Sequence, residues 1–157
     1  MNIEKMIDFQ DRLKKNNLTL TCAESCTGGL ISSKITSISG SSSIFKGSVI
    51  TYCNEMKEQE LNVSKQTMIN NGAVSIQVVN EMLDGVLKKF DASIAIAVSG
   101  IAGPGGGSEN KPVGTVIIGI KSICGYVNIQ KYLFKGSRIE IQEMATNKAF
   151  EIIFNKF

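Results

Sequence analysis

The chain has 157 residues, enough for one domain with a substantial hydrophobic core, and we expect that domain to comprise residues 1–157. Its net charge of +3, the lack of a basic run and an aromatic content of 6% argue against a surface that binds nucleic acid. No apolar run reaches the ~18 residues that span a membrane, and the first residues lack the apolar centre of a signal peptide, so we expect a cytoplasmic protein that contacts neither membrane nor nucleic acid.

The first half of the chain alternates between helical and strand patterns. Apolar residues at helical spacing predict an amphipathic helix over residues 3–16. A short apolar run at residues 18–23 predicts a strand, and residues 28–36 predict the helix that follows it. After a serine-rich loop at residues 37–43, residues 44–52 favour a second strand.

Three further helices are predicted next. Asn54 is expected to cap a helix that runs towards Leu61, and Ser64 is expected to cap a short helix after it. The short helix stops at Asn70-Asn71-Gly72, because Gly and Asn tolerate the left-handed conformation at a helix end. Residues 75–90 carry one broad apolar face and predict a long amphipathic helix.

The second half begins with an almost wholly apolar segment, residues 91–99, which predicts a central strand buried on both faces. Residues 100–108 form a glycine-rich loop, and residues 115–122 and 126–134 predict two strands joined as a hairpin. A last helix opens at Gly136-Ser137. Helices and strands mixed in this way predict an α/β fold, namely a three-layer α/β/α sandwich with a mixed sheet.

Cysteine and histidine content restricts the possible chemistry. The four cysteines form no C-x-x-C pair and the chain has no histidine, so we expect no metal site and, in a reducing compartment, free thiols. A Ser-His-Asp or Cys-His triad is impossible within this chain. A nucleophilic mechanism would have to take its base from Lys, Asp, Glu or Tyr.

Residues 21–29 join the first predicted strand to its helix and concentrate polar side chains. Glu24, Ser25 and Thr27 carry oxygens at this junction, and Gly28-Gly29 follow. Backbone N–H groups at the start of a helix lack partners within it and can hold an anion or a developing oxyanion. The alternative is that Ser and Thr only cap the helix.

Lys57 lies near the start of the predicted helix after the second strand. With Asn54 as the cap, it occupies the third helical position, where the positive end of the helix dipole disfavours a cation. That field, together with burial, lowers the pKa of a lysine, and a neutral amine near Ser25 can remove its hydroxyl proton. The alternative is a surface lysine compensated by the glutamates of the same helix.

The loop at residues 100–108 contains five glycines and one proline. Glycine allows close backbone approach, so the N–H groups of this loop can wrap an anion such as phosphate, although neither the P-loop nor the G-x-G-x-x-G pattern is present. The alternative is a flexible surface loop. Arg138 is a candidate to clamp a phosphate, and Lys111 is either a second phosphate partner or a solvated charge.

Three polar segments thus follow predicted strands, at residues 23–29, 52–57 and 99–108. In an open α/β sheet, ligands bind beyond the carboxyl ends of the strands. We therefore expect these segments to meet at one edge of the sheet and to form a single site there.

Several motifs follow one another over nearly the whole chain. They are Ala23-Glu24-Ser25-Cys26-Thr27-Gly28-Gly29, Gly40-Ser41-Ser42, Tyr52-Cys53-Asn54-Glu55-Met56-Lys57, Gly72-Ala73-Val74-Ser75, Ser99-Gly100-Ile101-Ala102-Gly103-Pro104-Gly105-Gly106 and Lys111-Pro112-Val113-Gly114-Thr115-Val116. In sequence and in order, these motifs resemble those of the CinA C-terminal domain family. The late segment departs from the family's tendency towards G-D-R-x-x-[IV]-R, because Ser137 and Gln142 stand where Asp and a second Arg are usual.

This resemblance implies an α/β/α fold, no cofactor and homo-oligomers. The stand-alone, PncC-like members of the family are nicotinamide mononucleotide amidohydrolases. It therefore also implies hydrolysis of the nicotinamide carboxamide to nicotinic acid mononucleotide and ammonia, a step of pyridine nucleotide salvage. The alternatives are a non-catalytic nucleotide-binding or competence-related module, and an amidase that acts on another pyridine nucleotide.

On this basis we expect Ser25 to be the nucleophile and Lys57 the base, with Tyr52 assisting proton transfer to the leaving ammonia. Thr27 is the alternative nucleophile, in which case Ser25 is a cap. Backbone N–H groups near residues 26–28 would stabilise the oxyanion. The expected substrate-binding residues are Glu24, Gly28, Gly29, Asn54, Gly100, Ala102, Gly103, Gly105, Lys111 and Arg138.

Overall fold

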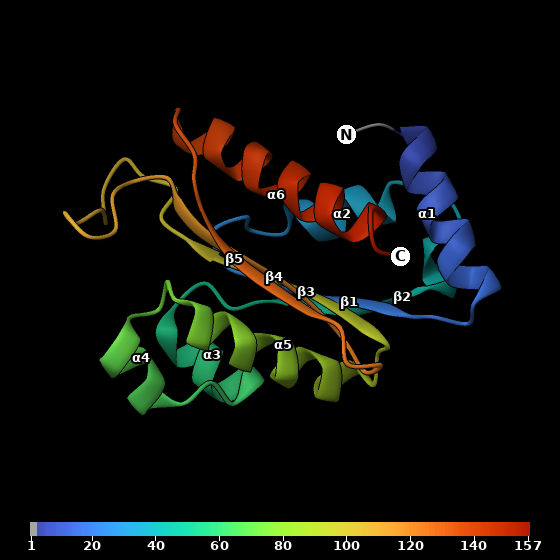
Figure 1. The fold of residues 1–157 in the computed structure, drawn as a ribbon, viewed down its shortest axis with the longest axis horizontal. Coiled ribbons are helices and arrows are strands. Elements are labelled where there is room, and N and C mark those ends of the chain that lie inside the picture. The colour runs from blue at the N-terminus through green and yellow to red at the C-terminus, as the bar shows by residue number, and fades with distance from the viewer. Residues whose placement is uncertain (1–2) are drawn as a thin grey trace.

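A computed structural model describes residues 3–157, in which a sheet lies between two layers of helices (Figure 1). Residues 1 and 2 of the predicted domain lie outside the described residues. The strands of the described chain are β1 (Leu20–Glu24), β2 (Phe45–Ile50), β3 (Ile94–Gly100), β4 (Thr115–Ser122) and β5 (Val127–Leu133). Its helices are α1 (Ile3–Lys15), α2 (Leu30–Thr36), α3 (Asn54–Leu61), α4 (Lys65–Asn71), α5 (Ile76–Phe90) and α6 (Arg138–Phe154), with a short 3₁₀ helix η1 (Ser41–Ser43).

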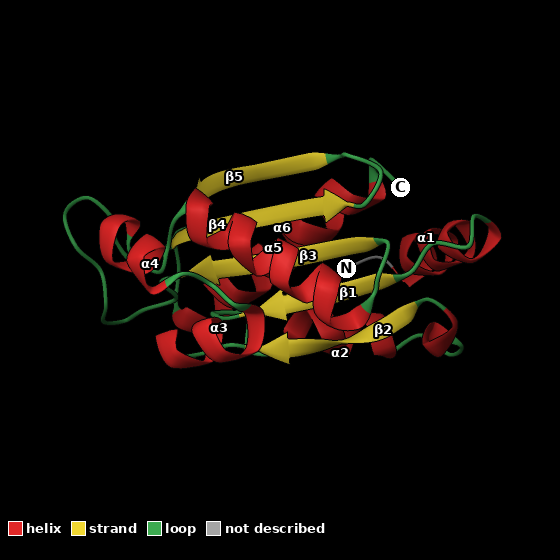
Figure 2. Cartoon of the chain, turned by 90° about the horizontal axis from the view of Figure 1, so that it is seen from below, coloured by secondary structure: helices red, strands yellow, loops and turns green. Residues whose placement is uncertain are grey.

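The strands of residues 3–157 form one mixed sheet in the order β2-β1-β3-β4-β5 (Figure 2). β1 is parallel to both β2 and β3, whereas the β3–β4 and β4–β5 pairs are antiparallel. The carboxyl ends of β1, β2 and β3 therefore meet at one edge of the sheet, and β4 and β5 form the predicted hairpin.

Two helical layers enclose this sheet. Helices α1, α2 and α6 cover one face, and α3, α4 and α5 cover the other (Figure 1). The arrangement confirms the predicted three-layer α/β/α sandwich with a mixed sheet. Within residues 3–157, no helix combines the length and the apolar character needed to cross a membrane.

The central strand β3 is buried on both faces, as its apolar run predicts. Ile94, Ile96 and Val98 belong to the core on the side of α1, α2 and α6. Ala95 and Ala97 belong to the core on the opposite side, with the apolar face of α5. Small side chains on this second face let α5 lie close to the sheet.

Two glycines mark the tightest contacts of α5. A Cβ at Gly119 of β4 would lie 2.7 Å from a side-chain carbon of α5, and a Cβ at Gly85 of α5 would lie 2.1 Å from the carbonyl oxygen of Leu61. Leu61 is the last residue of α3, the helix that carries Lys57. The position of Lys57 is therefore fixed through α5 by close packing against the sheet.

Helix α2 begins two residues later than predicted. Gly28 and Gly29 have φ angles of +60° and +100°, in the left-handed region that a right-handed helix excludes. The strands β1 and β2 are likewise shorter than predicted, since β1 begins at Leu20 and β2 ends at Ile50.

The prediction that Asn54 caps α3 was wrong. Cys53 has an extended backbone, with φ −101° and ψ 168°, and occupies the N-cap position without a side-chain cap hydrogen bond. Asn54 is the first residue of the helix, so Lys57 is the fourth rather than the third. Ser64, by contrast, caps α4 as predicted, since its side chain accepts from a backbone N–H of the first turn.

Gly85→Ala should destabilise the protein, although alanine is favoured over glycine in a helix by about 1 kcal/mol. The added methyl group would overlap the Leu61 carbonyl oxygen, and overpacking costs about 1–3 kcal/mol. We expect the free energy of unfolding in urea to fall by roughly 1–2 kcal/mol. Lys88→Ala, at an exposed position of the same helix, should change it by less than about 0.5 kcal/mol. Higher stability of Gly85→Ala would mean that α3 moves away from α5 without cost.

Candidate active site

The three segments predicted to meet at the edge of the sheet do meet there. They follow β1, β2 and β3, and with the first residue of α6 they bound a cavity of about 230 Å³. This cavity is the candidate active site. The residues that line it are Ser25, Cys26, Tyr52, Gly100, Ile101, Ala102, Gly103, Gly105, Gly106 and Arg138.

Lys57 and Ser25 are in direct contact. The amine Nζ donates to Oγ of Ser25 at 3.2 Å and to the carbonyl oxygen of Thr51 at 2.8 Å. Only 2% of Lys57 is exposed, and burial lowers the pKa of its amine, against the opposing influence of nearby thiols and Glu55. More of this lysine is neutral at a given pH than of a lysine in water, and the neutral amine can accept the Ser25 proton.

The Glu24 carboxylate is fully buried and binds the turn after β1 and the start of α2. One oxygen accepts from the Thr27 hydroxyl at 2.8 Å and from the N–H groups of Gly29 at 3.0 Å and Ile31 at 3.2 Å. The other accepts from the N–H of Ser32 at 2.9 Å and from its hydroxyl at 2.6 Å. Glu24 is not among the residues that line the cavity, so these charge-assisted bonds hold the turn in place instead.

The two candidate nucleophiles have different partners. Thr27 is 1% exposed, does not line the cavity, and donates its hydroxyl to Glu24. Ser25 lines the cavity, and its hydroxyl contacts the amine of Lys57. The geometry therefore favours Ser25 over Thr27 as a nucleophile.

The turn after Ser25 carries backbone donors for an oxyanion. The N–H of Gly28 closes the turn on the Ser25 carbonyl oxygen at 3.1 Å. Within residues 3–157, the N–H groups of Cys26 and Thr27 donate to no backbone or side-chain oxygen. Cys26 lines the cavity and directly follows Ser25, and the residue after the nucleophile is the one that supplies an oxyanion donor in acyl-transfer sites on strand–turn–helix junctions.

Arg138, at the mouth of the cavity, binds both the segment after β2 and the glycine loop after β3. Its Nη1 donates to the carbonyl oxygen of Gly103 at 2.7 Å, and its Nη2 donates to the Tyr52 hydroxyl. Tyr52 is 57% exposed, and in the described part of the chain its hydroxyl makes no hydrogen bond with Lys57. Arg138 thus places positive charge at the mouth, beside the glycine loop.

Several predicted substrate-binding residues lie away from the cavity. Asn54 is exposed, in a hollow between α3 and α4. Lys111 donates through Nζ to the carbonyl oxygen of Asn71 at 2.6 Å, at the end of α4. Gly28 and Gly29 shape the turn through their positive φ angles without lining the cavity. The predicted residues that do line it are Ser25, Tyr52, Gly100, Ala102, Gly103, Gly105 and Arg138.

Some residues of the site belong to predicted segments but were not among the predicted site residues. Cys26, Ile101 and Gly106 line the cavity, and burial raises the pKa of the Cys26 thiol to about 12, so it stays protonated. Gln142 donates through Nε2 to the Cys26 carbonyl oxygen at 2.7 Å. In the sequence, Gln142 stands out only as a departure from the family's usual second Arg, and its place four residues after Arg138 is the signal that puts it on the same helix face.

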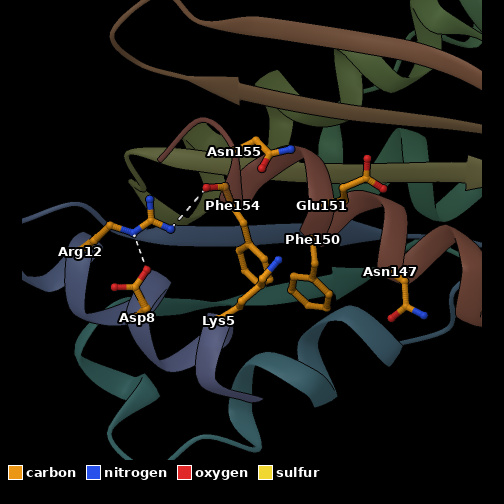
Figure 3. A pocket seen from close by; sticks show the side chains of 8 residues that line it. All are labelled: Lys5, Asp8, Arg12, Asn147, Phe150, Glu151, Phe154 and Asn155. Atoms are coloured by element: carbon orange, nitrogen blue, oxygen red, sulfur yellow. Dashed lines mark hydrogen bonds and ion pairs between the residues drawn. The ribbon is translucent and has the colours of Figure 1, made fainter. Parts of the chain in front are cut away.

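A larger cavity, of about 500 Å³, lies between α1 and α6, at the other end of the molecule from the glycine loop (Figures 1 and 3). Figure 3 shows the rings of Phe150 and Phe154 among charged side chains, with Arg12 donating to the Phe154 carbonyl oxygen at 3.3 Å and pairing with Asp8 at 3.2 Å. Its lining contains no serine, threonine or cysteine, so the smaller cavity remains the candidate site. Within residues 3–157, no group of three carboxylate or thiol side chains is placed to hold a metal ion.

Comparisons with known proteins find matches along the whole described chain. The family model described as "CinA C-terminal domain" matches residues 3–157. A "CinA-like protein" of Fervidobacterium nodosum is 52% identical over 141 residues, and a "Putative competence-damage inducible protein" of Halothermothrix orenii is 46% identical over 142 residues. Each match covers 90% of this chain but 34% of the relative, so the chain spans about a third of the length of these curated relatives.

Solved structures of similar proteins share the fold. The competence/damage inducible protein CihA of Agrobacterium tumefaciens superposes with a TM-score of 0.89 at 37% identity, covering 97% of this chain and 96% of that one. The competence damage-inducible protein A of Klebsiella pneumoniae superposes with a TM-score of 0.92 at 32% identity, covering 98% and 94%.

Glu24→Gln should destabilise the protein strongly. The side-chain amide would place an NH₂ group against backbone and hydroxyl donors that now bind a carboxylate oxygen, which costs roughly 2–4 kcal/mol. Urea denaturation measures the loss, and Ser25→Ala, one residue along, is the control that should stay within about 1 kcal/mol of the parent protein. Equal stability of the two variants would mean that the carboxylate does not hold the turn.

The lowered pKa of Lys57 makes stability depend on pH. Between the lowered native pKa and the ordinary value of 10.5, the unfolded chain binds more protons than the folded chain, so the parent protein loses stability as the pH falls. Lys57→Met removes this titration. We therefore expect the unfolding free energy of the variant, relative to the parent, to increase when urea denaturation is repeated at about pH 7 instead of about pH 10.

Lys88→Met, an exposed change of the same chemistry, is the control for this pH series and should show the same difference from the parent at both pH values. A pH-independent difference for Lys57→Met as well would contradict the lowered pKa.

Proposed function

The chain belongs to the CinA C-terminal domain family, and we propose that it is an amidohydrolase that converts nicotinamide mononucleotide into nicotinic acid mononucleotide and ammonia. The observation that carries the proposal is the contact between Oγ of Ser25 and the buried amine of Lys57, beside a cavity bounded by a glycine loop. A serine with a neutral lysine as its base supports acyl transfer in a chain without histidine. The choice of substrate is supported by the resemblance of the motifs to those of stand-alone amidohydrolases of the family.

The first half of the proposed reaction acylates Ser25. Its Oγ attacks the carboxamide carbon while Nζ of Lys57 takes the hydroxyl proton, and a tetrahedral intermediate with a negatively charged oxygen forms. The N–H groups of Cys26 and Thr27, which donate to no oxygen within residues 3–157, are the proposed donors to that oxygen. One donor of this kind contributes about 10²–10³ in kcat in other hydrolases, so two provide much of the acceleration.

The second half releases both products. The protonated amine of Lys57 returns its proton to the carboxamide nitrogen, which leaves as ammonia and leaves an acyl group on Ser25. Water then attacks the acyl carbon while Lys57 accepts one of its protons, and the bond from that carbon to Oγ breaks as Lys57 returns the proton to Ser25. Nicotinic acid mononucleotide loses its acidic proton to solvent and departs as a carboxylate. The Thr51 carbonyl oxygen accepts from Nζ and keeps the amine beside Ser25 in both steps.

The nucleotide is proposed to lie with its carboxamide at Ser25 and its phosphate towards the mouth. The glycine loop presents backbone there without side chains, and Arg138 adds a positive charge. The absence of side chains at Gly105 and Gly106, where a Cβ would meet little or nothing, leaves room for close approach of the phosphate oxygens.

The alternative is a module that binds a nucleotide without turning it over. The competence-related names of several relatives favour this alternative. It predicts binding of nicotinamide mononucleotide without release of ammonia, so one ammonia assay on the purified protein separates the two functions.

Ser25→Ala should lower the rate of ammonia release from nicotinamide mononucleotide by about 10³-fold or more, because backbone donors cannot replace a nucleophile. Ammonia release is the measurement. Thr27→Ser, which keeps a hydroxyl for Glu24, is the matched control and should remain within about tenfold of the parent protein.

Two outcomes would count against this assignment. Ordinary turnover by Ser25→Ala would exclude Ser25 as the nucleophile, and an acyl adduct located on Thr27 by mass spectrometry would move the nucleophile there. Binding of the nucleotide by the parent protein without any ammonia would favour the binding module.

A further inference from the structure

The side chain of Gln142 reaches the turn that carries the proposed oxyanion donors. Gln142 is the fifth residue of α6. Its Nε2 donates to the Cys26 carbonyl oxygen at 2.7 Å, although Gln142 and Cys26 are 116 residues apart in sequence. Gln142 is half-buried and Cys26 is 5% exposed, so the hydrogen bond is largely shielded from water.

This hydrogen bond also constrains a neighbouring N–H group. The Cys26 carbonyl and the Thr27 N–H belong to one planar peptide unit, which in its trans form directs the two groups to opposite sides. Among residues 3–157 only the Gly103–Pro104 peptide bond is cis. A donor that holds the carbonyl therefore sets the direction of the Thr27 N–H, one of the two N–H groups of the turn without a protein oxygen as partner.

The same face of α6 holds a second loop of the cavity. Arg138 lies one helical turn before Gln142 and donates to the Gly103 carbonyl oxygen in the glycine loop. Both bonds start from a helix whose first turn is fixed by a capping box, and both end on backbone carbonyls of loops around the cavity. One helix face thus sets the two loops relative to each other.

We propose that Gln142 is a positioning residue for the oxyanion site: its hydrogen bond keeps the turn after Ser25 aligned so that the turn's N–H groups meet the developing oxyanion. Glu24 holds the turn through the Thr27 hydroxyl and the Gly29 N–H, whereas the peptide unit between Cys26 and Thr27 is held at its carbonyl by Gln142. The inference rests on the proposed function for the identity of the nucleophile, and it holds for any acyl group that Ser25 attacks.

The test uses p-nitrophenyl acetate, a small activated ester, on the whole protein. Ser25 attacks the ester carbonyl, p-nitrophenolate leaves, and an acetyl group remains on Oγ after the same kind of tetrahedral oxyanion has formed. Acetylation of the peptide that contains Ser25 is followed by mass spectrometry, with Ser25→Ala as the blank for reaction at other groups. kcat and KM for nicotinamide mononucleotide are measured on the same variants.

Gln142→Met has about the length of glutamine but no donor. It should lower the acetylation rate of Ser25, and kcat for the nucleotide, by about 10- to 100-fold with KM changed by less than about threefold. Gln142→Arg restores a donor and should stay within about threefold of the parent protein in both assays. Gln130→Met, on the exposed strand β5, is the matched control and should leave both rates unchanged.

Undiminished acetylation of Ser25 in Gln142→Met would overturn the inference, and so would a rise in KM without a fall in kcat. Equal losses in Gln142→Met and Gln142→Arg, or a parent protein whose Ser25 is not acetylated, would overturn it as well. If the parent protein releases no ammonia from the nucleotide while acetylation still depends on Gln142, the proposed substrate fails and the role of Gln142 stands.

Discussion

The amine of Lys57 is buried, within hydrogen-bond distance of the Ser25 hydroxyl and of the Thr51 carbonyl oxygen. Two oxygen partners replace only part of the hydration that the ammonium form has in solvent, so burial favours the neutral form. The rest of the fold has to supply the free energy that this placement costs. The same desolvation makes the amine a usable base in a chain that has no histidine.

Two separate parts of the core bring the lysine and the serine together. On one face of the sheet, the alanines of β3 and Gly119 let α5 lie close to the strands, and Gly85 lets α3 lie close to α5. On the other side of the contact, the buried carboxylate of Glu24 holds the turn that begins at Ser25. The amine of Lys57 is therefore positioned by close packing, and the hydroxyl of Ser25 by charge-assisted hydrogen bonds to the turn that follows it.

The elements and their meeting point could be predicted from the sequence because they depend on local patterns. The apolar run of residues 91–99 and the helical face of residues 75–90 are properties of consecutive residues, and the rule for parallel strands then brings three loops to one edge. The prediction for Asn54 failed because Asn is favoured at the N-cap position, whereas the backbone of this chain places Cys53 at that position. Lys111 and Gln142 have partners 40 and 116 residues away. The spacing from Arg138 places Gln142 on the same helix face, but no local pattern identifies the carbonyl oxygen that either side chain contacts.

The guanidinium of Arg138 donates to the Tyr52 hydroxyl and to the Gly103 carbonyl oxygen. These bonds use two of the five N–H donors of an arginine, so the group is anchored and keeps donors to offer an anion. A phosphate that reached the proposed site would meet a cation whose direction is already set, and less side-chain entropy would be lost on binding than with an unanchored arginine. A nucleoside lacks the anion and would gain nothing from the remaining donors.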